Sequence, residues 1–117
     1  MQDLEEVRIL FERIFESYER LEKTRNLDVM KSISNNLEEL ASHLNTIVLV
    51  AEVENIGGRA LVDFLNKITM ETNEIVVWIS LTSKNDKVGS EILEFLFQSS
   101  MLSHLIEKLK MLYRLIF

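Results

Sequence analysis

The sequence of 117 residues contains no proline, no cysteine and only three glycines, Gly57, Gly58 and Gly89. Proline is the strongest helix breaker, so its absence leaves helices to end at the glycines and at polar loops. The absence of cysteine excludes disulfide bonds and thiolate metal ligands. These absences favour long helices and leave the redox compartment open.

The sequence also has no apolar run that reaches the roughly 18 residues needed to span a membrane. Residues 1–10 carry acids where a secretory signal carries basic residues, so we expect a cytoplasmic protein without a membrane partner. The net charge of −6 argues against a protein whose whole surface grips nucleic acid. A local basic patch is still compatible with that charge.

Apolar residues recur at alternating steps of three and four in four stretches of the chain, and we call these positions the seam. Its members are Leu4, Val7, Phe11, Ile14, Tyr18, Leu21; Met30, Ile33, Leu37, Leu40, Leu44, Ile47, Ala51; Leu61, Leu65, Ile68, Thr72, Ile75, Ile79; and Phe95, Gln98, Leu102, Leu105, Leu109, Leu112, Ile116. A period of about 3.5 is typical of helices that pack lengthwise. The seam predicts an all-α fold, an antiparallel bundle of about four long helices with coiled-coil-like packing. We expect a single domain over residues 1–117.

The predicted helices cover about residues 3–23, 27–55 and 59–81, and a fourth runs from Asp86 or Ser90, either of which can cap it, to the C-terminus. Asp3 and Asn26 are expected to cap the first two helices, and Gly57 and Gly58 to end the second. Two segments, 46–53 and 74–81, are almost continuously apolar and β-branched, which is also compatible with short buried strands. We favour helices because the seam passes through both segments without a break.

No catalytic or metal-binding motif emerges from the sequence. Di-iron bundles need Glu-x-x-His pairs, whereas Leu40 and Met101 precede His43 and His104 by three residues. Glu39 and His43 share a helix face, but one carboxylate and one imidazole do not form a closed metal site. We therefore predict a non-enzymatic protein with no cofactor and no metal.

The predicted third and fourth helices carry more apolar residues than one helix face can bury in a bundle of this size. Such a surplus indicates either a helix that is buried all round or a contact with another protein. We predict a protein interface that includes Trp78, Phe97, Tyr113, Leu115, Ile116 and Phe117.

A basic end is predicted where the first and third loops meet in an up-down-up-down bundle. Its members are Lys23, Arg25, Lys31, Lys84 and Lys87, with Asp28 and Asp86 as the nearby acids. This basic end is a candidate contact for nucleic-acid phosphates, although most clusters of this kind are solvated loop charges.

In size, all-helical plan and lack of catalytic residues, the chain resembles the small subunit of archaeal type I-A CRISPR surveillance complexes. The resemblance implies an antiviral defence role, contacts with large and backbone subunits, and support of target-DNA and R-loop binding through the basic end. The alternative is a stand-alone homodimeric helical regulator or adaptor, of the kind that virus- or plasmid-encoded inhibitors represent. Both interpretations make other protein chains the partners, and the second predicts self-association.

Overall fold

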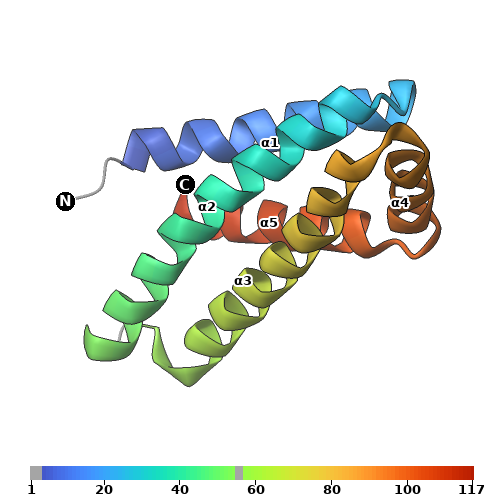
Figure 1. Ribbon diagram of the computed structural model, residues 1–117. Coiled ribbons are helices and arrows are strands. Elements are labelled where there is room, and N and C mark those ends of the chain that lie inside the picture. The colour runs from blue at the N-terminus through green and yellow to red at the C-terminus, as the bar shows by residue number, and fades with distance from the viewer. Residues whose placement is uncertain (1–3, 55–56) are drawn as a thin grey trace.

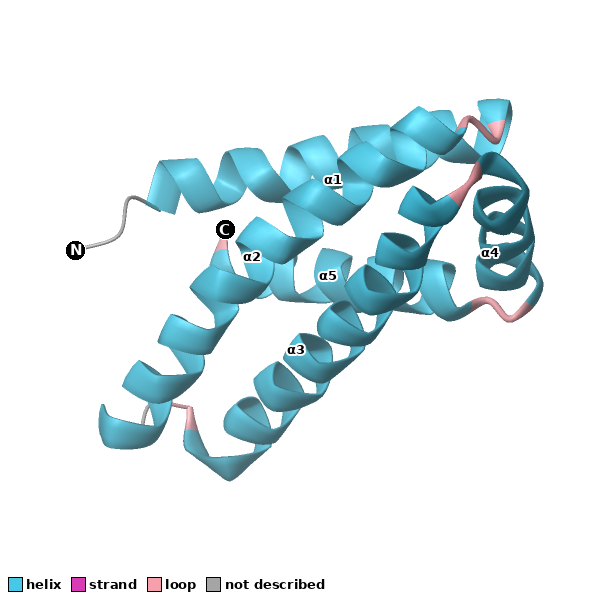
Figure 2. Cartoon of the chain, in the orientation of Figure 1, coloured by secondary structure: helices cyan, strands magenta, loops and turns pink. Residues whose placement is uncertain are grey.

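The computed structural model describes residues 4–54 and 57–117, without the side chains of Ala51, Ser83 and Lys84 (Figure 1). These residues form α1 (Leu4–Thr24), α2 (Leu27–Glu54), α3 (Gly58–Ser80), the 3-10 helix η1 (Leu81–Lys84), α4 (Asp86–Gln98) and α5 (Met101–Ile116). Figure 2 shows helices and loops and no strand over the described ranges, which confirms the all-α prediction. The described parts of segments 46–53 and 74–81 are therefore helical.

The long helices α1, α2 and α3 follow one another in antiparallel order (Figure 1). Helix α5 packs against α1 and α3, and the short helix α4 lies at the end of the molecule that holds the α1–α2 turn. The α2–α3 turn lies at the opposite end, where the two helices extend beyond α1 and α5. The molecule is elongated, with principal extents of 46 × 23 × 21 Å.

The hydrophobic core follows the seam through most of its length. Ile14 of α1, Leu37 of α2, Ile68 of α3 and Leu109 of α5 are fully buried in one apolar cluster. The polar seam member Thr72 is also fully buried, and its hydroxyl donates to the Ile68 carbonyl at 2.7 Å. Local bonding of this kind lets a helix bury a threonine without leaving its hydroxyl unpaired.

Among the seam positions whose side chains are described, three do not join the core. Leu4, Phe95 and Gln98 are exposed. Leu4 begins α1, where the helix extends past its neighbours. In α4 the buried positions are instead Gly89, Ile92, Leu93 and Leu96.

The prediction of one continuous fourth helix is wrong, because this part of the chain is divided into α4 and α5 at Ser99 and Ser100. Ser100 adopts a left-handed conformation with φ of 59°, and its amide bonds back to the Phe97 carbonyl at 3.2 Å. The predicted caps Asp86 and Ser90 are also wrong, because the side chain of Asn85 accepts from the Val88 amide at 2.8 Å.

The other helix ends match the predictions more closely. The Asn26 side chain accepts from the Asp28 amide at 2.7 Å, as expected of the cap of α2. Gly57 and Gly58 have φ of 73° and 72°, the left-handed conformation expected where the chain turns from α2 to α3. The predicted cap Asp3 and the predicted helix end at Asn55 lie outside the described residues. No helix in the described ranges is long and apolar enough to cross a membrane.

Candidate protein-protein interface

The end of α2 carries exposed apolar side chains on the part of the helix that extends past the core. Val48 is the last residue of α2 described as buried, and Leu65 is the first buried residue of α3. Beyond Val48, Leu49 is 62% exposed, Val50 47% and Val53 84%. We call Leu49, Val50 and Val53 the distal α2 surface.

The distal α2 surface explains why segment 46–53 reads as almost continuously apolar. Within this segment Val48 is buried and Ile47 is half-buried against the core. Leu49 and Val53 are one helical turn apart and lie off that buried face. A helix end that is apolar on both faces buries one face internally and leaves the other for a contact.

Charged residues accompany the distal α2 surface. Glu52 and Glu54 are exposed on the same helix end. Across the turn, Arg59 and Asp63 of α3 form a loose, solvent-exposed ion pair at 3.9 Å. An apolar centre with a charged periphery is the usual composition of protein interfaces.

A second exposed apolar surface lies on the outer face of α3. Met70 is 72% exposed and Val77 is 63% exposed. They line a shallow groove together with Lys67, Glu71, Asn73 and Glu74. Met70 and Val77 are two helical turns apart, whereas Leu49, Val50 and Val53 lie within five consecutive residues, so the exposed apolar side chains are more closely spaced on the distal α2 surface.

The predicted interface residues Trp78 and Phe97 are half-buried. The Trp78 ring lies 5.0 Å from the ring of Phe95, which pairs the end of α3 with α4. Phe97 stacks on Tyr18 of α1, with ring centroids 6.2 Å apart. Both predicted residues therefore already contribute to packing between helices of the same chain.

The predicted C-terminal interface residues separate into two groups. Tyr113 and Phe117 pack with Phe11 of α1, at centroid distances of 5.7 and 6.3 Å, and Ile116 packs against the core. Leu115 is 69% exposed, and Phe117 is still 43% exposed despite its contact with Phe11, so both keep apolar surface that faces solvent. The C-terminus packs back onto α1, so part of the apolar area that was predicted to contact a partner is used within the chain.

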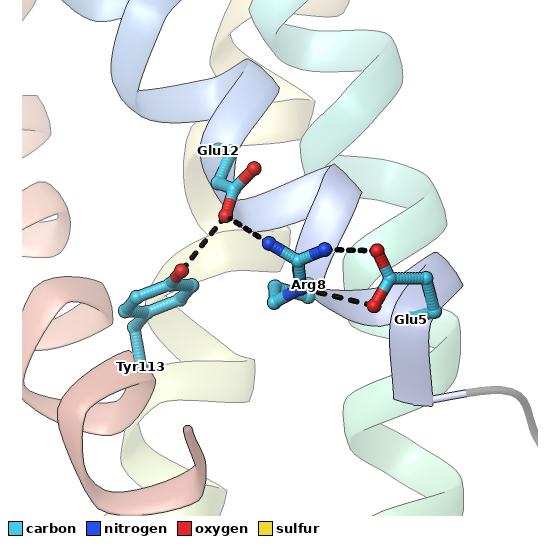
Figure 3. Close-up of polar contacts among 4 residues, drawn as sticks. All are labelled: Glu5, Arg8, Glu12 and Tyr113. Atoms are coloured by element: carbon cyan, nitrogen blue, oxygen red, sulfur yellow. Dashed lines mark hydrogen bonds and ion pairs between the residues drawn. The ribbon is translucent and has the colours of Figure 1, made fainter.

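Polar contacts fix the Tyr113 ring against α1 (Figure 3). The Tyr113 hydroxyl donates to Oε2 of Glu12 at 2.8 Å, and Arg8 Nη1 donates to the same oxygen at 2.9 Å. Arg8 also pairs with Glu5. The hydrogen bond to Glu12 raises the pKa of the Tyr113 hydroxyl above its ordinary value, and burial acts in the same direction.

The structure brings the predicted basic residues to one end of the molecule. Leu27 at the start of α2 lies against Gly89 of α4, which places the first and third loops together. Lys23, Arg25 and Lys87 are exposed there, Lys31 is half-buried, and the side chain of Lys84 lies outside the described residues. The Arg25 guanidinium lies 3.5 Å from the centroid of the Phe97 ring, so part of its surface is already covered by a cation–π contact.

The two histidines have different surroundings. Glu6 of α1 joins Glu39 and His43, and one ligand atom from each of these residues lies within 4.8 Å of the others. The spacing of Glu39 and His43 in the sequence indicates that they share a helix face, but no sequence signal points to Glu6, because only the antiparallel pairing of α1 with α2 brings it near. His104 lines a cleft with Glu71 and Lys108, where the Lys108 ammonium binds both Glu71 oxygens at 2.6 and 2.7 Å.

Comparison with known proteins does not assign the chain to a family, because no family, no curated protein and no solved structure matches it. Its function must therefore be argued from its own residues.

Proposed function

We propose that this chain is a non-catalytic helical subunit that binds another protein through the distal α2 surface. The observation that carries the proposal is the exposure of Leu49, Val50 and Val53 on a helix end beyond the core. Large apolar side chains that cluster on a projecting element are typical of protein contacts. The site is built on a helix, and buried Val48 ties that helix to the core.

The size of the distal α2 surface sets how strongly it can bind. Burying a fully exposed valine or leucine side chain contributes about 1.5–3 kcal/mol. Leu49, Val50 and Val53 are 62%, 47% and 84% exposed, so together they contribute about as much as two such side chains, roughly 3–6 kcal/mol. Association of two proteins costs about 4–15 kcal/mol in lost freedom of motion. The three side chains cannot hold a complex alone, and the partner must also contact neighbouring residues such as Glu52 or Ile47.

Two partner classes remain predictions from the sequence. The resemblance to type I-A small subunits predicts large and backbone subunits as partners, and the alternative predicts a second copy of this chain. The contact of the basic end with nucleic acid also stays a prediction. Arg25 is exposed, and one face of its guanidinium lies on the Phe97 ring.

Site-specific photo-crosslinking tests the proposal. A benzophenone side chain at Glu52, which Leu49 and Val53 flank, should form an adduct in extract of the source organism. The same label at Asn73, flanked by Met70 and Val77, serves as the matched control and should form markedly less adduct. Mass spectrometry of the adduct would identify the partner, and a second copy of this chain would support the homodimeric alternative.

The double variant Leu49→Glu/Val53→Glu should abolish the adduct from position 52 without unfolding the chain. Both side chains are more than half exposed, and exposed substitutions usually change stability by about 0.5 kcal/mol or less. Circular dichroism and thermal unfolding check the fold. Equal crosslinking from positions 52 and 73, or an adduct that survives the double variant, would contradict the proposal.

A further inference from the structure

Glu6, Glu39 and His43 form a group of potential metal ligands that spans two helices. One carboxylate oxygen of Glu6 and of Glu39 and one imidazole nitrogen of His43 lie within 4.8 Å of one another. Glu39 and His43 are one turn apart on α2, which places both side chains on the same helix face. Glu6 approaches them from the antiparallel helix α1.

The helix backbones around this group are held by the core. Next to Glu6, the side chain of Val7 is buried, and next to Glu39 and His43 those of Leu40 and Leu44 are fully buried. These contacts fix the register of α1 against α2 independently of the polar group. The ligands therefore project from rigid elements, and only their side-chain rotamers need to adjust to a bound ion.

The electrostatics of the group favour a cation. Two carboxylates at close range repel each other unless a positive charge lies between or beside them. Arg13 lines the adjoining cleft together with Glu6 and Glu39 and supplies part of that charge. His43 is half-buried, and Glu6 and Glu39 are exposed, so the group is open to ions from solution.

We propose that Glu6, Glu39 and His43 bind a divalent transition-metal ion, with Zn²⁺ as the best match. Zinc accepts imidazole nitrogen and carboxylate oxygen at about 2.0–2.2 Å in tetrahedral geometry, which places the ligand atoms about 3.4 Å apart. Rotamer adjustment from the observed limit of 4.8 Å reaches that separation. Mg²⁺ and Ca²⁺ fit poorly, because they prefer all-oxygen sites with six or more ligands.

The proposed site has three protein ligands and one position for water. Zinc bound there links the N-terminal half of α1 to the middle of α2, so the ion stabilises the folded chain by binding it in preference to the unfolded chain. His104 provides an internal comparison, because it belongs to no group of three potential metal ligands among the described residues.

Zinc titration of the full chain tests the proposal. Isothermal titration calorimetry should show one site for Zn²⁺ and none for Mg²⁺, and the melting temperature should rise with added Zn²⁺ and return with a chelator. Since the chain has two histidines and no cysteine, His43→Ala and His104→Ala form a matched pair.

His43→Ala should weaken zinc binding by more than the roughly 10- to 100-fold that residues merely supporting a ligand contribute. His104→Ala should leave affinity and the zinc-dependent melting shift unchanged. Glu39→Gln, which keeps the shape of the side chain, should also weaken binding. Absence of zinc binding in the wild type, or binding that survives both His43→Ala and Glu39→Gln, would overturn the proposal.

Discussion

At the residue scale, the contact between Tyr113 and Glu12 leads to a prediction about the stability of the folded chain at alkaline pH. The folded chain raises the pKa of Tyr113, mainly because its hydroxyl donates to the Glu12 carboxylate. The folded state therefore holds this proton more tightly than the unfolded state. The resulting stability is fully present below the unfolded pKa of about 10 and is lost as pH rises through the folded pKa.

Tyr113→Phe should make the fall in unfolding free energy above pH 10 shallower than in the wild type, as denaturant titrations at several pH values would show. Tyr18 is the second tyrosine, and its pKa is raised mainly by burial and then by the Glu22 charge. Tyr18→Phe should therefore also reduce the slope, and the two changes should add. A Tyr113→Phe chain with the wild-type pH dependence would show that the Glu12 contact does not persist in solution.

The burial of individual residues could be predicted where the seam runs through a whole helix with a regular period. Leu37 and Leu109 are seam members and are fully buried, as the pattern indicated. Phe95 is a seam member but is exposed, because the chain changes direction after α4. The pattern of apolar residues within α4 gives no sign of that change of direction. Glu6 could not be assigned to the candidate metal site, because its neighbours come from another helix.

At the element scale, Gly57 and Gly58 at the start of α3 lead to a prediction that distinguishes the cost of backbone strain from the cost of a steric clash. Gly57 and Gly58 both have φ near 70°, a region that costs other residues about 1–2 kcal/mol. A Cβ at Gly57 would lie 2.3 Å from Leu61 Cδ2, whereas a Cβ at Gly58 would meet nothing within 4 Å.

Both Gly57→Ala and Gly58→Ala should lower the unfolding free energy, and Gly57→Ala should do so more strongly. The difference is moderated because the clashing atom belongs to the end of a leucine side chain that can change rotamer. Chemical denaturation of the two variants beside the wild type measures both values. Equal stability losses would mean that backbone conformation alone accounts for the glycines.

The boundary between α4 and α5 shows why helix ends were harder to predict than helices. Ser99 and Ser100 follow an apolar run in a pattern that also fits a continuous helix, and serine is tolerated within helices. Ser100 adopts a left-handed conformation without being glycine, so the usual sequence signal for a helix end is missing. By contrast, Gly57 and Gly58 are a sequence signal for the change from α2 to α3, and both adopt the left-handed conformation that was predicted there.

At the scale of the whole molecule, the chain consists of a packed body and a projecting pair of helix ends. The body contains the fully buried residues of α1, α2, α3 and α5 in one cluster. The described residues after Val48 in α2, at positions 49, 50 and 52–54, are all exposed, and so are residues 57–60 before and at the start of α3. The sequence predicted these helices. It did not predict that the end of α2 and the start of α3 would stay uncovered, because that depends on where α1 and α5 pack.

This arrangement predicts that the projecting helix ends open more easily than the body. Short helices are marginal in water without tertiary packing, and local opening costs less where few apolar side chains are buried. Native-state hydrogen exchange should show weaker protection for residues 50–54 and 59–63 than for residues 33–44 and 68–79. Uniform protection across these ranges would mean that the projecting ends unfold only with the whole chain.

Two variants distinguish the contribution of the buried face of this helix end from that of its exposed face in the same hydrogen-exchange experiment. Val48→Ala removes buried apolar volume worth about 1–2 kcal/mol, so it should further weaken protection of residues 50–54. Leu49→Glu/Val53→Glu changes side chains that face solvent, so protection in the free chain should stay unchanged. With the crosslinked partner bound, wild-type protection of residues 50–54 should rise, and the double variant should not respond. A rise in protection that the double variant retains would place the contact elsewhere on the molecule.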